Sequence, residues 1–135
     1  MIKKVLVVSF FLYLSSASLA REDSHWKGDG NSLLHSCSLM VKVLDGEHIS
    51  SGENIDASFC NGYILGVGDM DSFLRAFEQE RKVNSGIVHL CVPSGVTTGQ
   101  VVRVVAKWLK NNPEKLEMPA SALVLAALRE AFPCK

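Results

Sequence analysis

The sequence lacks the residue spacings that most catalytic, metal and cofactor sites require. It has no HExxH motif, no CxxC pair and no aspartate-rich loop, so we expect no metal site. No glycine-rich turn follows a strand pattern, which leaves no phosphate-binding loop and no indication of a cofactor. Acidic and basic side chains number 14 each. The chain therefore has no charge excess that would attract nucleic acid or an anionic membrane surface.

A membrane-spanning run is also missing, although a shorter apolar run opens the chain. Two lysines precede the uncharged run 5–14, and small residues ending at Ala20 follow. This order is typical of a cleaved secretory signal peptide, and the run is about half of the roughly 20 residues that a membrane span needs. We therefore predict a signal peptide at 1–20 and one exported domain at 21–135, located in the periplasm without a membrane anchor.

Four cysteines lie in the predicted mature chain, at Cys37, Cys60, Cys91 and Cys134. An even number in a small exported domain predicts two disulfides. A disulfide removes the thiolate that a cysteine nucleophile requires. We therefore expect no catalytic residue and do not expect an enzyme.

The mature chain is predicted to be all-α, a small bundle of about four main helices. The helices are expected at 31–45, 54–77, 97–111 and 119–132. Asn31 or Ser32 is the expected cap of the first and Asn54 of the second. Thr97 and Gln100 have the spacing of a capping box. The residues before the second helix are expected to be a loop, residues 21–30 a mobile lead-in, and 78–82 a solvated helix end. The segment 78–92 as a whole stays unassigned: residues 84–86 indicate a turn, and 87–92 is either extended or only leads into Pro93.

The helix expected at 54–77 is central, and its glycines are unusual. Its apolar residues follow steps of three and four, which predicts a single apolar stripe. Gly62, Gly66 and Gly68 lie inside it, although each internal glycine costs roughly 0.5–1 kcal/mol relative to alanine. We predict that Gly62 and Gly66 let another helix approach closely, either within the chain or across a dimer. Asp71 is expected to be solvated.

The order of the helices predicts which cysteines pair. Short connections predict that the first two helices form one antiparallel hairpin and the last two another. Cys37 then lies opposite Cys60, and Cys91 lies beside Cys134. We therefore predict the disulfides Cys37–Cys60 and Cys91–Cys134.

Several stretches together resemble one known family. They are Gly30-Asn-x-Leu-Leu-x-x-Cys37, Cys60-Asn-Gly-Tyr-Ile-Leu-Gly-Val-Gly-Asp69, Cys91-Val-Pro-Ser-Gly-Val-Thr-x-Gly-Gln-Val-Val-Arg-Val-Val-x-Lys-Trp-Leu109, Asn112-Pro-Glu-x-Leu116 and Ala126-Ala-Leu-x-Glu-Ala-Phe-Pro-Cys134. Their order is similar to that of the Rap/Tai immunity proteins of the bacterial type VI secretion system. The resemblance implies a periplasmic helical protein, often a homodimer. It also implies that the protein neutralises a cognate peptidoglycan amidase, similar to NlpC/P60 peptidases, by occluding its Cys–His active-site cleft.

The resemblance carries over structural residues more firmly than contact residues. Beside the cysteines these are Gly62, Tyr63, Gly66, Asp69, Gly99 and Gln100, for which hydrogen-bonded or packing roles are expected. The hypothesis for toxin contact is one of the polar connections 47–53, 78–85 and 111–117. Its candidate residues are Glu47, Glu53, Glu78, Glu80, Asn111, Glu114, Lys115 and Glu117. A small helical periplasmic chaperone of the acid-stress kind is the alternative, and a helical lipid carrier ranks after it.

Overall fold

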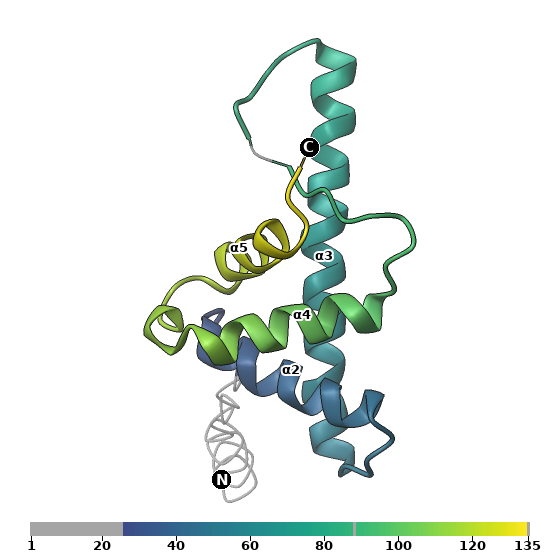
Figure 1. The fold of residues 1–135 in the computed structure, drawn as a ribbon, viewed down its shortest axis with the longest axis vertical. Coiled ribbons are helices and arrows are strands. Elements are labelled where there is room, and N and C mark those ends of the chain that lie inside the picture. The colour runs from purple at the N-terminus through teal and green to yellow at the C-terminus, as the bar shows by residue number, and fades with distance from the viewer. Residues whose placement is uncertain (1–25, 88, 135) are drawn as a thin grey trace, which may run out of the picture.

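The computed structural model describes residues 26–87 and 89–134, which form an all-α arrangement (Figure 1). Its elements are α2 (Gly30–Leu44), α3 (Ser51–Arg81), α4 (Thr98–Asn111), the short 3₁₀ helix η1 (Pro113–Lys115) and α5 (Ala120–Ala131). Within these described ranges there is no strand, and a single antiparallel bridge joins Asp29 to Pro119. The predicted all-α class is therefore confirmed. The predicted signal peptide lies outside the described residues.

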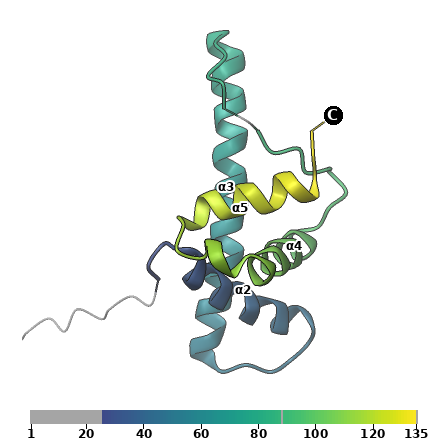
Figure 2. The same ribbon diagram turned by 60° about the vertical axis from the view of Figure 1, so that its left-hand side comes forward.

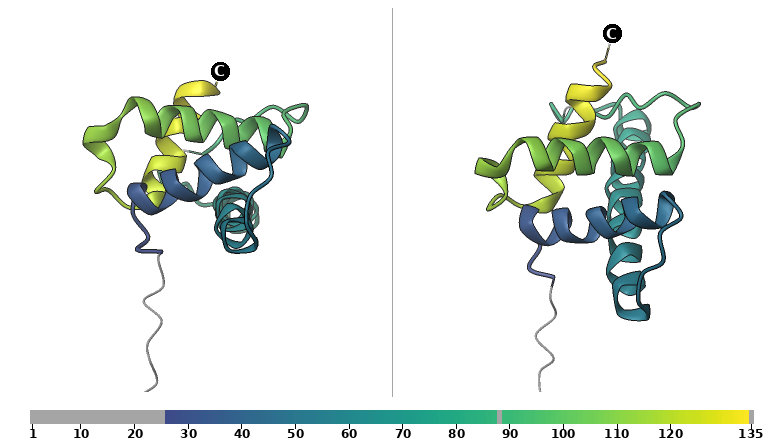
Figure 3. Two further views of the ribbon diagram at one scale, coloured as in Figure 1. Left: turned by 90° about the horizontal axis from the view of Figure 1, so that it is seen from below. Right: turned by 60° about the horizontal axis from the view of Figure 1, so that its bottom comes forward.

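The helices cross rather than forming two antiparallel hairpins. α2 and α4 lie side by side, and α3 runs across both (Figures 1 and 3). α5 passes across α4 and across the middle of α3 (Figure 2). The hairpin prediction is wrong because the turn after α2, with Gly46 at φ +79°, lets α3 leave at a steep angle. One end of α3 therefore projects beyond the other helices.

Both predicted disulfides are present despite this difference in geometry. Cys37 joins Cys60 with their Cα atoms 4.9 Å apart, at the crossing of α2 and α3. Cys91 joins Cys134 at a Cα separation of 5.2 Å, which fixes the segment before α4 to the end of the chain. The pairing depends on which helices touch and not on their crossing angle. All four cysteines are thus in disulfides.

The helix caps differ from two of the three predictions. Asp29 caps α2 by accepting a hydrogen bond from the amide of Ser32 at 2.8 Å. Ser50 and Glu53 form a reciprocal capping box at α3, so the helix begins at Ser51. Asn54 is not the cap, because it lies one turn inside. The predicted capping box at the start of α4 is confirmed.

All four α-helices contribute to one apolar core. The largest fully buried side chains lie on α2, α4 and α5, and α3 contributes Cys60 of the first disulfide. They are Leu33, Leu109, Leu123, Val102, Val105, Val124, Cys37 and Cys60. No helix in the described part of the chain is both long and apolar enough to cross a membrane.

The lead-in to α2 is held in place where the structure describes it. The amide of Gly30 donates to the carbonyl of Met118 at 3.1 Å, and Ala120 donates to Gly28 at 2.9 Å. A methyl group on Gly30 would lie 2.8 Å from the backbone of Leu116. The prediction of a mobile lead-in is therefore wrong for residues 26–30, which pack against the start of α5.

Candidate binding surface

α3 carries two apolar faces, only one of which faces the core. Of its 31 residues only Ala57, Cys60, Ile64 and Asp71 are buried. Besides Leu65, five large apolar side chains on the same helix are between 43% and 66% exposed. They are Ile55, Phe59, Met70, Phe73 and Phe77. At 3.6 residues per turn, these five positions share one sector of the helix, opposite the buried residues. The prediction of a single apolar stripe is wrong, since it merged two faces with the same spacing.

Gly62 and Gly66 lie on this exposed face. We call these two glycines and the five apolar residues the outer seam. A Cβ atom built on Gly62, Gly66 or Gly68 would meet no atom within 4 Å. Of the two predicted alternatives, close approach of a helix within the chain is therefore wrong for the described residues, and approach across a dimer stays a prediction. The glycines instead leave the flanks of α3 open.

Two open grooves flank α3, and the three glycines contribute to their walls. A groove of about 400 Å³ runs between Gly62 and Gly66 on α3 and Leu125 on α5. A second groove of about 410 Å³ lies on the α4 side, where Gly68 and Val101 are among its lining residues. Both grooves expose mainly apolar side chains to solvent. The glycines thus shape a surface on the described molecule instead of closing an internal contact.

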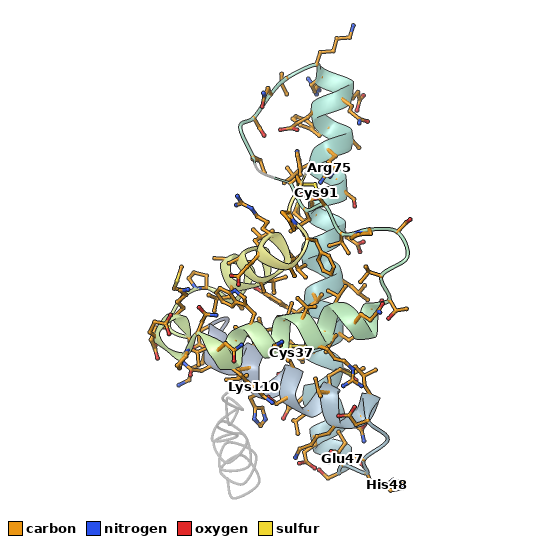
Figure 4. All side chains as sticks on the ribbon, in the orientation of Figure 1. Cys37, Glu47, His48, Arg75, Cys91 and Lys110 are labelled. Carbon is orange, nitrogen blue, oxygen red and sulfur yellow. A yellow bond between two sulfur atoms is a disulfide. The ribbon has the colours of Figure 1, made fainter. Side chains whose placement is uncertain are left out.

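Four charged or ionisable side chains meet near the projecting half of α3. We call Asp71, Arg75, Glu78 and His89 the His89 cluster; Figure 4 labels Arg75 in it and the neighbouring Cys91. His89 Nδ1 lies 2.9 Å from Asp71 Oδ1, and its Nε2 lies 2.9 Å from Glu78 Oε2. Arg75 Nε donates to Asp71 Oδ2 at 3.0 Å. The two carboxylates approach opposite nitrogens of the ring, so they do not converge on a point where a metal ion would bind.

The His89 cluster also bonds the backbone of the segment that returns from α3 to α4. Asp71 Oδ1 accepts from the amide of Leu90 at 3.2 Å, and Arg75 donates to the carbonyl oxygen of the same residue. Glu78 accepts from the amide of Ser85 at 3.1 Å and from its hydroxyl group. These bonds fasten the returning segment along one side of α3.

Hydrogen bonding sets the charge states in this cluster. Bonds from Ser85 and His89 lower the pKa of Glu78 to about 2. Burial acts to raise the pKa of Asp71, but bonds from His89 and Arg75 outweigh it and lower that pKa. The bonds to Glu78 and Asp71 raise the pKa of His89 above its ordinary value. Both carboxylates are therefore ionised near neutral pH, and their hydrogen bonds favour the protonated form of His89.

Two aspartates of α3, Asp69 and Asp71, have the opposite of the roles expected from the sequence. Asp71, expected to be solvated, is 9% exposed and belongs to the His89 cluster. Asp69 is exposed and has neither a hydrogen bond nor an ion pair within the described ranges. The spacing of Asp71 and Arg75, four residues apart, was an available signal for an ion pair on one helix face.

The other residues expected to be structural have packing or capping positions. Tyr63 packs on Trp26, with ring centroids 4.9 Å apart. A Cβ on Gly99 would lie 3.3 Å from a methyl carbon of Leu44, so this glycine gives α2 and α4 room to meet. Gln100 accepts from the amide of Thr97 at 2.8 Å within the capping box.

The three polar connections expected to contact a toxin lie at three separate ends of the molecule (Figure 4). Glu47 is at the turn between α2 and α3, while 78–85 is at the other end of α3. A helix of 31 residues is about 45 Å long at 1.5 Å per residue. The connection 111–117 follows α4, next to the labelled Lys110 on a third side. One compact partner site cannot use all three.

Several of the candidate contact residues are bonded within the chain. Glu78 belongs to the His89 cluster, and Glu53 to the capping box of α3. Glu117 accepts from Asn31 at 3.0 Å, while Lys115 lies over the ring of Trp108. Glu114 lies 3.6 Å from Lys115. Three candidates are exposed and have no side-chain bond in the described structure: Glu47, Glu80 and Asn111.

Comparison with known proteins identifies the family of the chain. The family model of Rap1a immunity proteins matches residues 29–134, from the cap of α2 to the last disulfide. The match includes the outer seam, the His89 cluster and both disulfides. No curated protein and no solved structure matches the chain.

Proposed function

Because the chain belongs to the Rap1a immunity protein family, we propose that it neutralises a cognate type VI secretion effector that is a peptidoglycan amidase. It binds this effector in the periplasm and occludes the Cys–His active-site cleft, which protects the producing cell and its siblings. The observation that carries the proposal is the family match over nearly the whole described chain. Binding without catalysis also suits a surface with apolar seams and no free thiol.

The end of α3 is the part of the molecule best shaped to enter a cleft. We call residues 77–87 the tip. It is a single helical end with its following turn, and it projects beyond α5 (Figures 1 and 2). Phe77, Val83 and Ile87 are 43–49% exposed there, and Glu80 and Arg81 add charge. An apolar centre with a charged rim is the usual composition of a protein-binding surface.

The tip is also held rigid, which favours binding. The His89 cluster ties Ser85 and Leu90 to α3, and the disulfide of Cys91 follows directly. A segment that is ordered before binding loses less conformational entropy on association. The rigidity of the tip therefore favours the connection 78–85 over 47–53 and 111–117 as the one that reaches the effector.

A lysis assay tests the function. Each amidase encoded beside this gene is directed to the periplasm of a test strain, with and without the protein. Rescue from a single amidase is the expected result. If no amidase is neutralised, the proposal is wrong. If instead the protein binds many unfolded clients at low pH and no single partner, the chaperone alternative is favoured.

Charge and polarity changes at the tip test where the effector binds. Val83→Asp and Glu80→Arg should weaken binding of the rescued amidase at least tenfold, since they alter the apolar centre and its rim. Glu47→Arg and Glu114→Arg are the matched controls, because both residues are exposed and lie at the other two ends. Equal affinity in all four variants would exclude the tip.

We propose that the outer seam pairs with the seam of a second copy to form a homodimer. A Cβ on Gly62 or Gly66 would meet no atom of the described residues within 4 Å, and the glycines lie near the middle of the seam. A two-fold axis there places glycine against glycine and lets the two α3 helices approach closely, with Ile55 and Met70 packing on either side. The central seam then forms the dimer and leaves the tip to the effector.

The mass of the protein in solution tests the dimer. Met70→Glu should give a monomer, because the change puts a charge into the seam. Leu65→Glu, at a 46% exposed position of α3 outside the seam, should leave the dimer intact. A wild-type monomer at high protein concentration, or an equal effect of both variants, would refute this interface.

N-terminal sequencing tests the proposed export: the periplasmic protein should begin at Arg21.

A further inference from the structure

His89 lies between two carboxylates in a site that is largely closed to solvent. Its ring nitrogens are each 2.9 Å from a carboxylate oxygen, of Asp71 on one side and of Glu78 on the other. The side chain of His89 is 17% exposed, that of Asp71 10% and that of Glu78 17%. When they are ionised, both carboxylates act as hydrogen-bond acceptors and cannot donate.

This geometry requires a protonated ring. A neutral imidazole has one N–H group and one nitrogen lone pair, whereas imidazolium has two N–H groups. Two ionised carboxylates at hydrogen-bond distance on both sides are therefore satisfied only by imidazolium. When the ring loses one of its two N–H protons, the carboxylate next to that nitrogen faces a lone pair, and the two groups repel each other.

The charged groups that face His89 in the described structure all come from α3. They are Asp71, Glu78 and Arg75, so two carboxylates are balanced by the guanidinium and the protonated ring. From the end of the chain, Cys134 Sγ lies 3.6 Å from the carbonyl oxygen of His89, but it is in a disulfide and does not titrate. His89 is thus the group in the cluster whose ordinary pKa lies nearest to neutral pH.

We propose that His89 is a proton-dependent switch that fastens the segment returning from the tip to α3 when the ring is protonated and releases it when the ring is neutral. The fastening bonds are those to the amides of Leu90 and Ser85, which share their carboxylate acceptors with the ring. Release frees a carboxylate to rotate towards water, and the backbone bond that it accepts is lost with it.

The direction of the pH dependence follows from the electrostatics. Hydrogen bonds to Glu78 and Asp71 raise the pKa of His89 in the folded protein. The stabilisation is therefore fully present below the ordinary histidine pKa of about 6.5 and is lost as the pH rises through the raised value. The carboxylates stay ionised over that range, since the pKa of Glu78 is about 2 and that of Asp71 is lowered.

Amide hydrogen exchange on the free protein tests the switch, so its result is independent of the proposed effector. The protection factors of the Ser85 and Leu90 amides should fall at least fivefold between pH 6 and pH 9. The amide of Val105, in the core of α4, should keep its protection. In His89→Gln the two reporter amides should show little pH dependence. His48→Gln, which changes an exposed histidine at the other end of α3 (Figure 4), should behave like the wild type.

Two results would overturn the proposal. One is constant protection of Ser85 and Leu90 across this pH range in the wild type. The other is an equal fall in His89→Gln. A second measurement needs no variant: the ring signals of His89 and the amide signal of Leu90 should titrate together by NMR. Different midpoints for the two signals would show that the ring does not control the segment.

Discussion

Replacing the glycines of α3 with alanine should stabilise the monomer. Gly62, Gly66 and Gly68 lie inside the helix, and a Cβ at each would meet no atom within 4 Å. Alanine therefore introduces no clash, while it removes the conformational cost that glycine imposes on a helix interior. Each substitution should raise the free energy of unfolding by roughly 0.5–1 kcal/mol, and the triple variant by about 1.5–3 kcal/mol.

The effect is large enough to measure by thermal unfolding. At about 4 °C per kcal/mol for a domain of this size, the triple variant should melt about 6–12 °C higher. Circular dichroism with the disulfides intact gives the melting temperature, and urea unfolding gives the free energy. The protein must be dilute, because added methyl groups at Gly62 and Gly66 should weaken pairing of the outer seam at high concentration.

The sign of the change decides whether α3 is open. If dilute Gly66→Ala melts below the wild type, an atom of the folded monomer occupies the space next to Gly66, and the assignment of an uncovered seam is wrong. If it melts higher but a second copy no longer binds at high concentration, the glycine is retained for that contact. Gly68→Ala is the matched control, since Gly68 lies outside the seam.

Three further predictions concern the packing and the charges. Gly30→Ala should destabilise the fold by about 1–3 kcal/mol in urea unfolding, since its Cβ would lie 2.8 Å from the backbone of Leu116; an unchanged midpoint would contradict this. Cys134→Ser should lower the free energy of unfolding by up to about 4 kcal/mol, because the lost disulfide spans 43 residues; an unchanged value would contradict it. With the pKa of Glu78 lowered to about 2, the melting-temperature advantage of wild type over Glu78→Gln should be present above pH 5 and vanish as the pH falls towards 2. The exposed Glu80→Gln is the control, and a difference that grows on acidification would contradict the sign.

The features that were predictable from the sequence depend on local signals. Thr97 and Gln100 specify a capping box through three residues of spacing, and the structure contains it. The disulfides follow from which helices are neighbours. The cap of α3 was predictable as well, because Ser50 and Glu53 have the same capping-box spacing, a signal that the prediction of Asn54 as the cap leaves unused.

The two faces of α3 could not be separated from the sequence. Phe59 and Cys60 are adjacent and both apolar, and both continue a helical spacing, yet one is 49% exposed and the other is fully buried. The same ambiguity affected Asp69 and Asp71. Periodicity indicates that a residue lies on a face, but tertiary packing decides which face is covered. The His89 cluster could not be predicted for a related reason, since it joins residues up to 18 positions apart through an irregular segment.

The sparse burial of α3 explains why this helix is held both by a disulfide and by the hydrogen bonds and ion pairs of the His89 cluster. Four of its 31 residues are buried, whereas α5 buries five of 12. A helix gains most of its stability from packing an apolar face, so a long helix with little packing would fray. The disulfide at Cys60 holds its first half, and the His89 cluster holds its second half without covering the outer seam or the tip. A chain that stabilises a helix by cross-links instead of by burial keeps that helix both rigid and accessible, and both properties are what a neutralising protein needs from the surface that meets its partner.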